Sequence, residues 1–104
     1  MTKIVPTVGR VVLYRLSDHD VRQILRMSGF KPGNDVKVGD VLPATVVKTW
    51  GEWPESAVNL QVMLDGPGTY WCPSRVVGDV PGSYHWMGYQ IGQAAKHAGE
   101  KPAA

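Results

Sequence analysis

The sequence predicts a mainly β fold, a small SH3-like antiparallel barrel of about five strands with one short helix inserted after the first strand. Glycine and proline separate short apolar runs along most of the chain, with 12 glycines and 8 prolines in 104 residues, a pattern typical of short strands joined by turns. One segment near the N-terminus instead has helical spacing. Small sheets rarely leave long edges exposed, so we expect this one to close. A two-layer α+β sheet is the alternative.

The first strand is expected over Arg10–Leu16, which is rich in β-branched and aromatic residues. A helix is then expected over Asp18–Ser28, because Ser17 is a favourable N-cap and Asp20 can complete a capping box with it. We expect the apolar residues of this helix to face the sheet and its arginines to face water. The inward residues are Val21, Ile24 and Leu25, and the outward ones are Arg22 and Arg26.

The next strands are expected over Val41–Trp50, Ala57–Leu64 and Tyr70–Val76, the last two forming a hairpin. Apolar and polar residues alternate between positions 57 and 64. This alternation predicts a buried face made of Val58, Leu60, Val62 and Leu64, with Asn59 and Gln61 outside.

Two prolines mark the end of the predicted sheet. Pro73 lacks a backbone donor and favours an edge strand or a break. Pro81 and Gly82 predict a type II turn before a short final strand over Tyr84–Met87.

The chain is expected to form one domain over residues 1–90, followed by a flexible tail over residues 91–104 that is dominated by alanine, glycine and proline. No apolar run approaches the length of a membrane span, and no signal peptide is apparent at the N-terminus. The single cysteine excludes an intramolecular disulfide framework and indicates a reducing, cytosolic compartment.

No catalytic, metal or cofactor motif is recognisable. The glycines form no phosphate-binding loop, and His19, His85 and His97 with one cysteine are too few and too far apart for a zinc site. Cys72 beside Pro73 is more typical of a small buried apolar residue than of a nucleophile. The carboxylates lie at predicted turns, loops and the helix start, where structural roles explain them. We therefore expect a non-enzymatic protein without a cofactor.

Aromatic residues are concentrated between residues 50 and 89, a stretch that contains all four tryptophans. They could build the core of a small barrel, or some could line a groove that binds a peptide or stacks nucleobases. The candidate binding surface consists of Trp50, Trp53, Trp71, Arg75, Tyr84 and Trp86. Among these, Trp53 is the residue that we expect to be exposed, because it lies within the polar loop GEWPES.

The distribution of charge favours a protein partner over nucleic acid. The net charge is only +2, and the lysines and arginines are dispersed rather than clustered. Arg22, Arg26 and Lys31 could form a small basic patch, although a solvated helix face explains them better. The leading hypothesis is therefore a protein-interaction module, and the alternative is a weak single-stranded nucleic-acid-binding module.

Five segments resemble a family of small uncharacterised proteins encoded by tailed bacteriophages and prophages. They are VGRVVLYRLSDHD at 8–20, VGDVLPATVVKTWG at 38–51, VNLQVMLDG at 58–66, YWCPSRV at 70–76 and PGSYHWM at 81–87. Members of this family usually have tryptophan in place of Tyr84 and proline in place of Met87. The resemblance implies a phage accessory or structural protein that binds a phage or host protein in the bacterial cytoplasm or is carried in the virion. It implies no catalytic or ligand residue.

Overall fold

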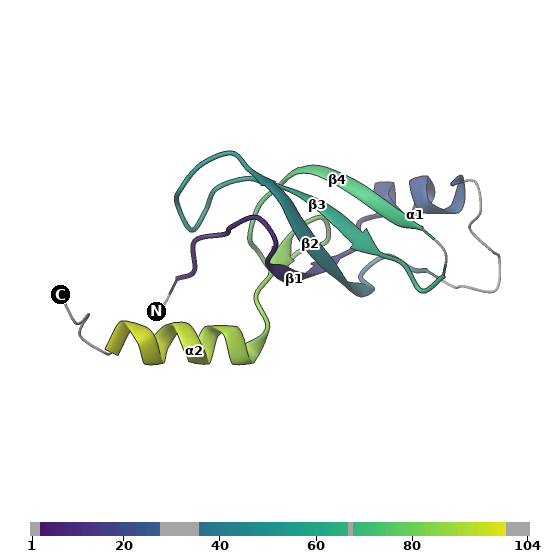
Figure 1. The fold of residues 1–104 in the computed structure, drawn as a ribbon. Coiled ribbons are helices and arrows are strands. Elements are labelled where there is room, and N and C mark those ends of the chain that lie inside the picture. Colours follow the sequence, from purple (N-terminus) through teal and green to yellow (C-terminus); the bar gives the residue numbers. More distant parts are fainter. Residues whose placement is uncertain (1–2, 28–35, 67, 100–104) are drawn as a thin grey trace.

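The computed structural model describes residues 3–27, 36–66 and 68–99. A five-stranded antiparallel sheet with the order β4-β3-β2-β1-β5 is accompanied by two helices (Figure 1). The strands are β1 (Val11–Arg15), β2 (Val41–Thr49), β3 (Val58–Met63), β4 (Thr69–Arg75) and β5 (Tyr84–His85), and the helices are α1 (Asp18–Leu25) and α2 (Gly88–Gly99). The predicted mainly β fold and the helix that follows the first strand are confirmed.

The buried face of the sheet follows the alternation predicted for β3. Val58, Leu60 and Val62 are fully buried, and Leu64 just beyond the strand is 8% exposed. Neighbouring strands add their own inward residues in register, since Val62 lies opposite both Ala44 in β2 and Tyr70 in β4. The rest of the core comprises Val12, Tyr14, Leu16, Ile24, Val46, Cys72, Tyr84 and Trp86.

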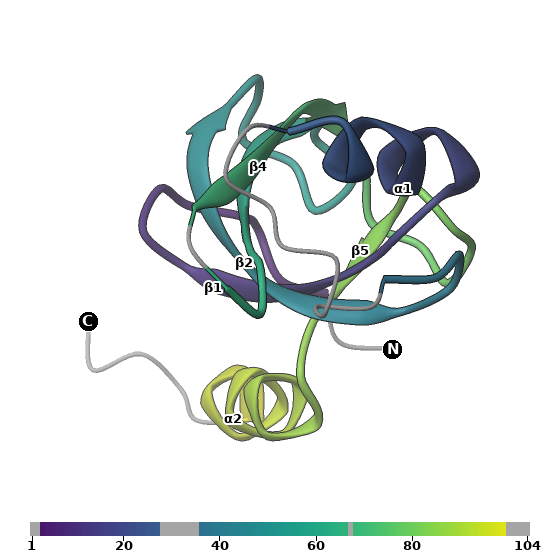
Figure 2. The same ribbon diagram turned by 90° about the vertical axis from the view of Figure 1, so that its right-hand side faces the viewer.

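The sheet is not closed, so the predicted barrel is not confirmed. β4 and β5 are its two edges, and the link near them is a single parallel bridge between Val77 and Tyr84. Figure 2 shows the sheet curling and α1 lying on its concave side, opposite β1 and β2. Side chains from α1 fill the space between the edges, because Ile24 is fully buried and Asp20 bonds to residues of β1 and β4.

Helix α1 begins as the sequence predicts. The Ser17 side chain accepts a hydrogen bond from the Asp20 backbone N–H at 3.1 Å, and the Asp20 carboxylate accepts one from the Ser17 N–H at 2.9 Å. Leu25 corrects the predicted helix face, because it is 57% exposed instead of buried. Leu25 is the last residue of the helix. The predicted extension to Ser28 falls outside the described residues.

Asn59 is buried, which contradicts its predicted position in solvent. Its Oδ1 accepts hydrogen bonds from the Trp50 indole N–H and the Ser74 backbone N–H, both at 3.0 Å. The register of β3 shifts against both neighbouring strands beside Asn59. On the β4 side, Ser74 has a φ of +56°, a rare conformation for a residue other than glycine. Asn59 therefore lies where β3 is out of regular register with both neighbouring strands. Its side chain accepts a hydrogen bond from the backbone of β4 at this position.

Helix α2 occupies residues 88–99, where the sequence predicts a flexible tail from residue 91 onward. Gln90 explains the start of the helix, because its Oε1 accepts a hydrogen bond from the Met87 backbone N–H and its Nε2 donates one to the Val11 carbonyl. The turn before β5 agrees with prediction, with Gly82 at a φ of +90°. Neither helix in the described part of the chain is long and apolar enough to cross a membrane.

Candidate functional site

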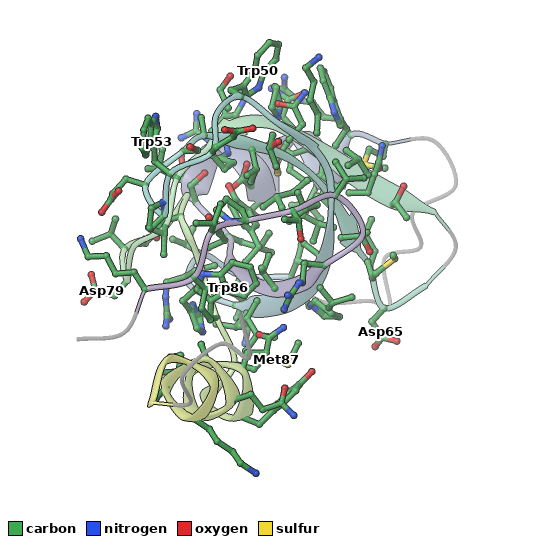
Figure 3. All side chains as sticks on the ribbon, turned by 60° about the vertical axis from the view of Figure 1, so that its left-hand side comes forward. Trp50, Trp53, Asp65, Asp79, Trp86 and Met87 are labelled. Atoms are coloured by element: carbon green, nitrogen blue, oxygen red, sulfur yellow. The ribbon has the colours of Figure 1, made fainter. Side chains whose placement is uncertain are left out.

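The structure divides the predicted binding residues into two groups. Trp50, Trp53 and Trp71 are exposed by 58%, 71% and 53%, and we call them the exposed tryptophans. Tyr84 and Trp86 are buried instead and pack edge to face with ring centroids 5.9 Å apart. Figure 3 shows Trp50 at the opposite end of the view from α2, Trp53 at one side, and Trp86 between the sheet and that helix. The buried pair belongs to the core, which contains both Tyr84 of β5 and Trp86 just after that strand.

Trp50 is held in place by polar and charged neighbours. Its indole N–H donates to Asn59 Oδ1, and the Lys48 ammonium lies 4.5 Å from the centre of its ring. A cation at this distance is attracted to the negative face of an indole. More than half of the Trp50 surface nevertheless stays in contact with solvent.

Trp71 lies on the same outer face of the sheet as Trp50. Trp71 pairs with Gln61 across β3 and β4, between the inward-facing residues Tyr70 and Cys72. Gln61 and Asn59 are two positions apart on β3 and therefore point to the same face. Since Trp50 bonds to Asn59, the two indoles flank neighbouring positions of β3 on its outer side.

Trp53 is presented by a tight turn between β2 and β3. Its backbone N–H donates to Ser56 Oγ at 2.8 Å, and its carbonyl accepts from the Ser56 N–H at 3.0 Å. A Cβ atom at Gly51 would lie 2.7 Å from the same Ser56 hydroxyl, so a larger residue there would displace the hydroxyl that bonds to Trp53. The prediction that Trp53 is exposed is confirmed.

The outer face of the sheet carries further exposed apolar residues. Val11 lies in one cross-strand row with Thr45, Gln61 and Trp71. Valine and methionine side chains around this row are also exposed, namely Val41, Val47 and Met63. The exposed tryptophans at β2 and β4 therefore border a sheet face that is poor in charge.

A buried carboxylate, Asp20, was not recognised as unusual from the sequence. Its side chain is fully buried and accepts hydrogen bonds from Tyr14 Oη at 2.5 Å and Tyr70 Oη at 2.8 Å. Arg75 completes the group, because its guanidinium lies 3.4 Å from the Asp20 carboxylate and donates to Tyr14 Oη at 2.9 Å. These residues join α1, β1 and β4.

The network keeps Asp20 ionised. Burial by itself would raise its pKa, but hydrogen bonds from Tyr14, the Ser17 backbone and Tyr70 hold the pKa below its ordinary value. Burial, together with the hydrogen bond to Asp20, raises the pKa values of Tyr14 and Tyr70. Both phenols therefore remain donors at physiological pH.

Cys72 lies at the edge of this network, with its Sγ 4.0 Å from Asp20 Oδ1. The thiol is fully buried, and burial followed by the charge of Asp20 raises its pKa to about 11. A neutral thiol of this kind is a poor nucleophile. The network is therefore a polar core that fastens the helix to the sheet, and the prediction of a buried Cys72 is confirmed.

The sequence gives little indication that Asp20, Tyr14, Tyr70 and Arg75 come together. The capping box indicated that Asp20 begins a helix, but its partners Tyr70 and Arg75 lie 50 and 55 residues further along the chain. Among residues 3–27, 36–66 and 68–99, no group of three or more His, Cys, Asp or Glu side chains could hold a metal ion.

Comparison of the chain with models of protein families, with curated protein sequences and with solved structures gives no match. The resemblance to phage-encoded proteins therefore stays a prediction.

Proposed function

We propose that this chain is a non-enzymatic protein-interaction module that binds its partner through the exposed tryptophans. The observation that carries this proposal is that three of the four indoles are more than half exposed although they lie on or beside ordered strands. Tryptophan is one of the three side chains, with tyrosine and arginine, that are enriched among residues that dominate binding energy at protein interfaces. The indole of Trp50 is also held by a hydrogen bond, so less of its conformational entropy is lost when a partner binds, and the backbone of Trp53 is held by the turn.

The charges around these tryptophans support a protein partner more than nucleic acid. Between residues 41 and 75 the only cations are Lys48 and Arg75, against the three anions Glu52, Glu55 and Asp65. Arg75 faces the buried Asp20, and Lys48 lies over Trp50. A groove that tracks a phosphate backbone would need an excess of positive charge.

The biological setting is also part of the proposal. On the resemblance of its five segments, the chain is an accessory or structural protein of a tailed bacteriophage or prophage. Its partner would then be a phage or host protein encountered in the bacterial cytoplasm or in the virion.

A peptide selection tests the mode of binding. A random twelve-residue peptide library is selected against the purified chain, and the affinity of the best peptide is measured by calorimetry. We expect Trp53→Ala and Trp71→Ala each to weaken binding about tenfold or more, since such residues contribute at least ~1.4 kcal/mol at binding centres. Leu25→Ala removes an equally exposed apolar side chain on α1 and is the matched control.

The same variants discriminate between a protein and a nucleic-acid partner. A twenty-residue oligothymidylate is titrated at low and high salt, because phosphate contacts weaken steeply as salt rises. Salt-dependent binding that is lost in Trp50→Ala, with no peptide selected, would contradict the proposal and establish the nucleic-acid alternative.

A further inference from the structure

A second binding feature lies beside α2, which is on the side of the sheet away from α1 (Figure 2). Here a pocket of about 290 Å³ is lined mainly by apolar side chains, with Trp86 in its wall. The other apolar residues come from separate segments: Ile4, Pro54, Val77 and Ile91. We call this the Trp86 pocket.

The walls of the pocket come from segments that are distant in sequence. Ile4 lies in the N-terminal segment, Pro54 in the turn after Trp53, and Ile91 in α2. Ile91 is 45% exposed, so the pocket leaves much of its side chain without an apolar neighbour. A second pocket of about 310 Å³ lies beside Gln90 and Ala94 of the same helix. Two pockets therefore adjoin α2, and Ile4 lines both of them.

The charges at the Trp86 pocket are already paired. Lys3 Nζ and Glu55 Oε1 form an ion pair at 2.6 Å, and both side chains are 60% exposed. A charged ligand would have to compete with this pair and then lose its hydration against apolar walls. The chemistry of the pocket therefore selects a neutral, apolar group.

The size and the position of the pocket indicate where that group comes from. Its volume is at the lower limit for sites that take drug-sized ligands, and suits one large side chain. Pro54 in its wall directly follows Trp53, the most exposed of the tryptophans. The pocket therefore adjoins the turn that presents Trp53, one of the residues that we propose for the interface.

We propose that the Trp86 pocket receives a single large apolar side chain, aromatic or leucine, from the protein partner that contacts Trp53. This inference rests on the proposed function and adds the chemistry of the partner's anchor residue. The residues that dominate binding energy at an interface usually cluster in well-packed pockets near its centre. An apolar side chain buried in a pocket beside an exposed aromatic residue fits this arrangement.

The test uses capped amino acids as probes of the pocket. N-acetyl amides of tryptophan, leucine, lysine and glutamate are titrated into the isotope-labelled full chain and followed by NMR. We expect the tryptophan and leucine amides to shift the Trp86 indole N–H and the Ile4 and Ile91 methyl signals, saturating at millimolar concentration. Shifts confined to Trp50 and Trp71, or equal shifts from the lysine and glutamate amides, would overturn the inference.

A pair of variants on α2 provides the matched control. Ile91→Lys places a charge at the pocket, whereas Tyr89→Lys changes an exposed residue of the same helix that does not line it. Ile91→Lys should abolish the shifts caused by the tryptophan amide and weaken the selected peptide about tenfold, with less than a twofold effect from Tyr89→Lys. Melting curves of both variants verify that the fold is retained.

The outcomes separate this inference from the proposed function. If the affinity of the selected peptide depends on Trp53 but not on Ile91, the proposed interface is supported. The inference that the Trp86 pocket receives a side chain of the partner is then overturned. If the capped residues bind at the pocket but no peptide depends on the exposed tryptophans, the proposed function fails. Micromolar binding of decanoate, without binding of either apolar amide, would overturn the inference in favour of a free apolar ligand.

Discussion

Asp20 shows how one residue can serve both a helix end and a core. Its carboxylate caps the N-terminus of α1 and also accepts hydrogen bonds from two phenols that lie far apart in sequence. An ionised group without water is unfavourable unless donors surround it, and here four donor groups do so when Arg75 is included. The buried charge of Asp20 is therefore tolerated only when the helix and the sheet are packed together.

Replacing Asp20 by asparagine should destabilise the fold by about 3–5 kcal/mol, since removal of one member leaves Arg75 and its neighbours without the charge that they surround. Asp18→Asn is the control, because the Asp18–Arg22 pair is exposed and worth about 0–1 kcal/mol. Urea unfolding of both variants at neutral pH measures the difference. Similar values for the two variants would disprove a structural role for the buried charge.

The contribution of Asp20 should also depend on pH. Its pKa is lower in the folded protein than in the unfolded chain, so the ionised form stabilises the fold above its unfolded pKa of about 3.9. This contribution is lost as the pH falls through the folded pKa. We expect the difference in unfolding free energy between wild type and Asp20→Asn to be constant near neutral pH and to shrink below about pH 4. A constant difference across this range would contradict the assignment.

At the scale of elements, α1 depends on its cap. Ser17→Ala should lower the free energy of unfolding by about 0.5–2 kcal/mol, because the Asp20 N–H loses its acceptor. Ser17→Thr keeps a hydroxyl at this position and should retain most of the stability. Denaturation followed by circular dichroism compares the three proteins, and an alanine variant as stable as wild type would mean that the cap contributes nothing.

The stability that strand β3 contributes depends on the packing of its buried side chains. Leu60→Ala should cost about 2–5 kcal/mol, because Leu60 is fully buried and its removal leaves a cavity. Gln61→Ala, one position along on the outer face, should change stability by only about 0.5 kcal/mol. Thermal melting of both variants is the measurement. Equal effects would mean that the inward and outward faces of β3 have been assigned wrongly.

At the scale of the whole molecule, α2 is joined to the sheet by little more than Gln90. In the described part of this helix Gln90 is the only buried residue, and Tyr89 and Ile91 remain exposed. Figure 1 shows the helix lying below the sheet, on the side away from α1. A helix attached in this way can separate from the sheet without opening the core.

Gln90→Ala removes two side-chain hydrogen bonds, each worth about 0.5–1.5 kcal/mol. We expect the amide hydrogens of α2 to exchange about tenfold faster or more, while those of β2 and β3 change little. Gln93→Ala, an exposed glutamine on the same helix, is the control. Faster exchange throughout the sheet would show that α2 unfolds only together with the core.

The sequence by itself determined the features that depend on neighbours along the chain. The alternation in β3, the Ser17 cap, the turn at Gly82 and the exposed Trp53 all follow from local pattern, and the structure has them as predicted. Local features of this kind are set by backbone geometry and by the nearest side chains, which a single sequence displays directly.

Only the tertiary structure decided which residues meet across the fold. It buried Tyr84, Trp86 and Asn59, assembled donors around Asp20, and left the sheet open beneath α1. Each of these outcomes depends on contacts between segments that are distant in sequence, and periodicity contains no information about such pairings. An amphipathic residue such as tryptophan is tolerated in a core or on a surface, so its role is settled by the strand register and the packing around it.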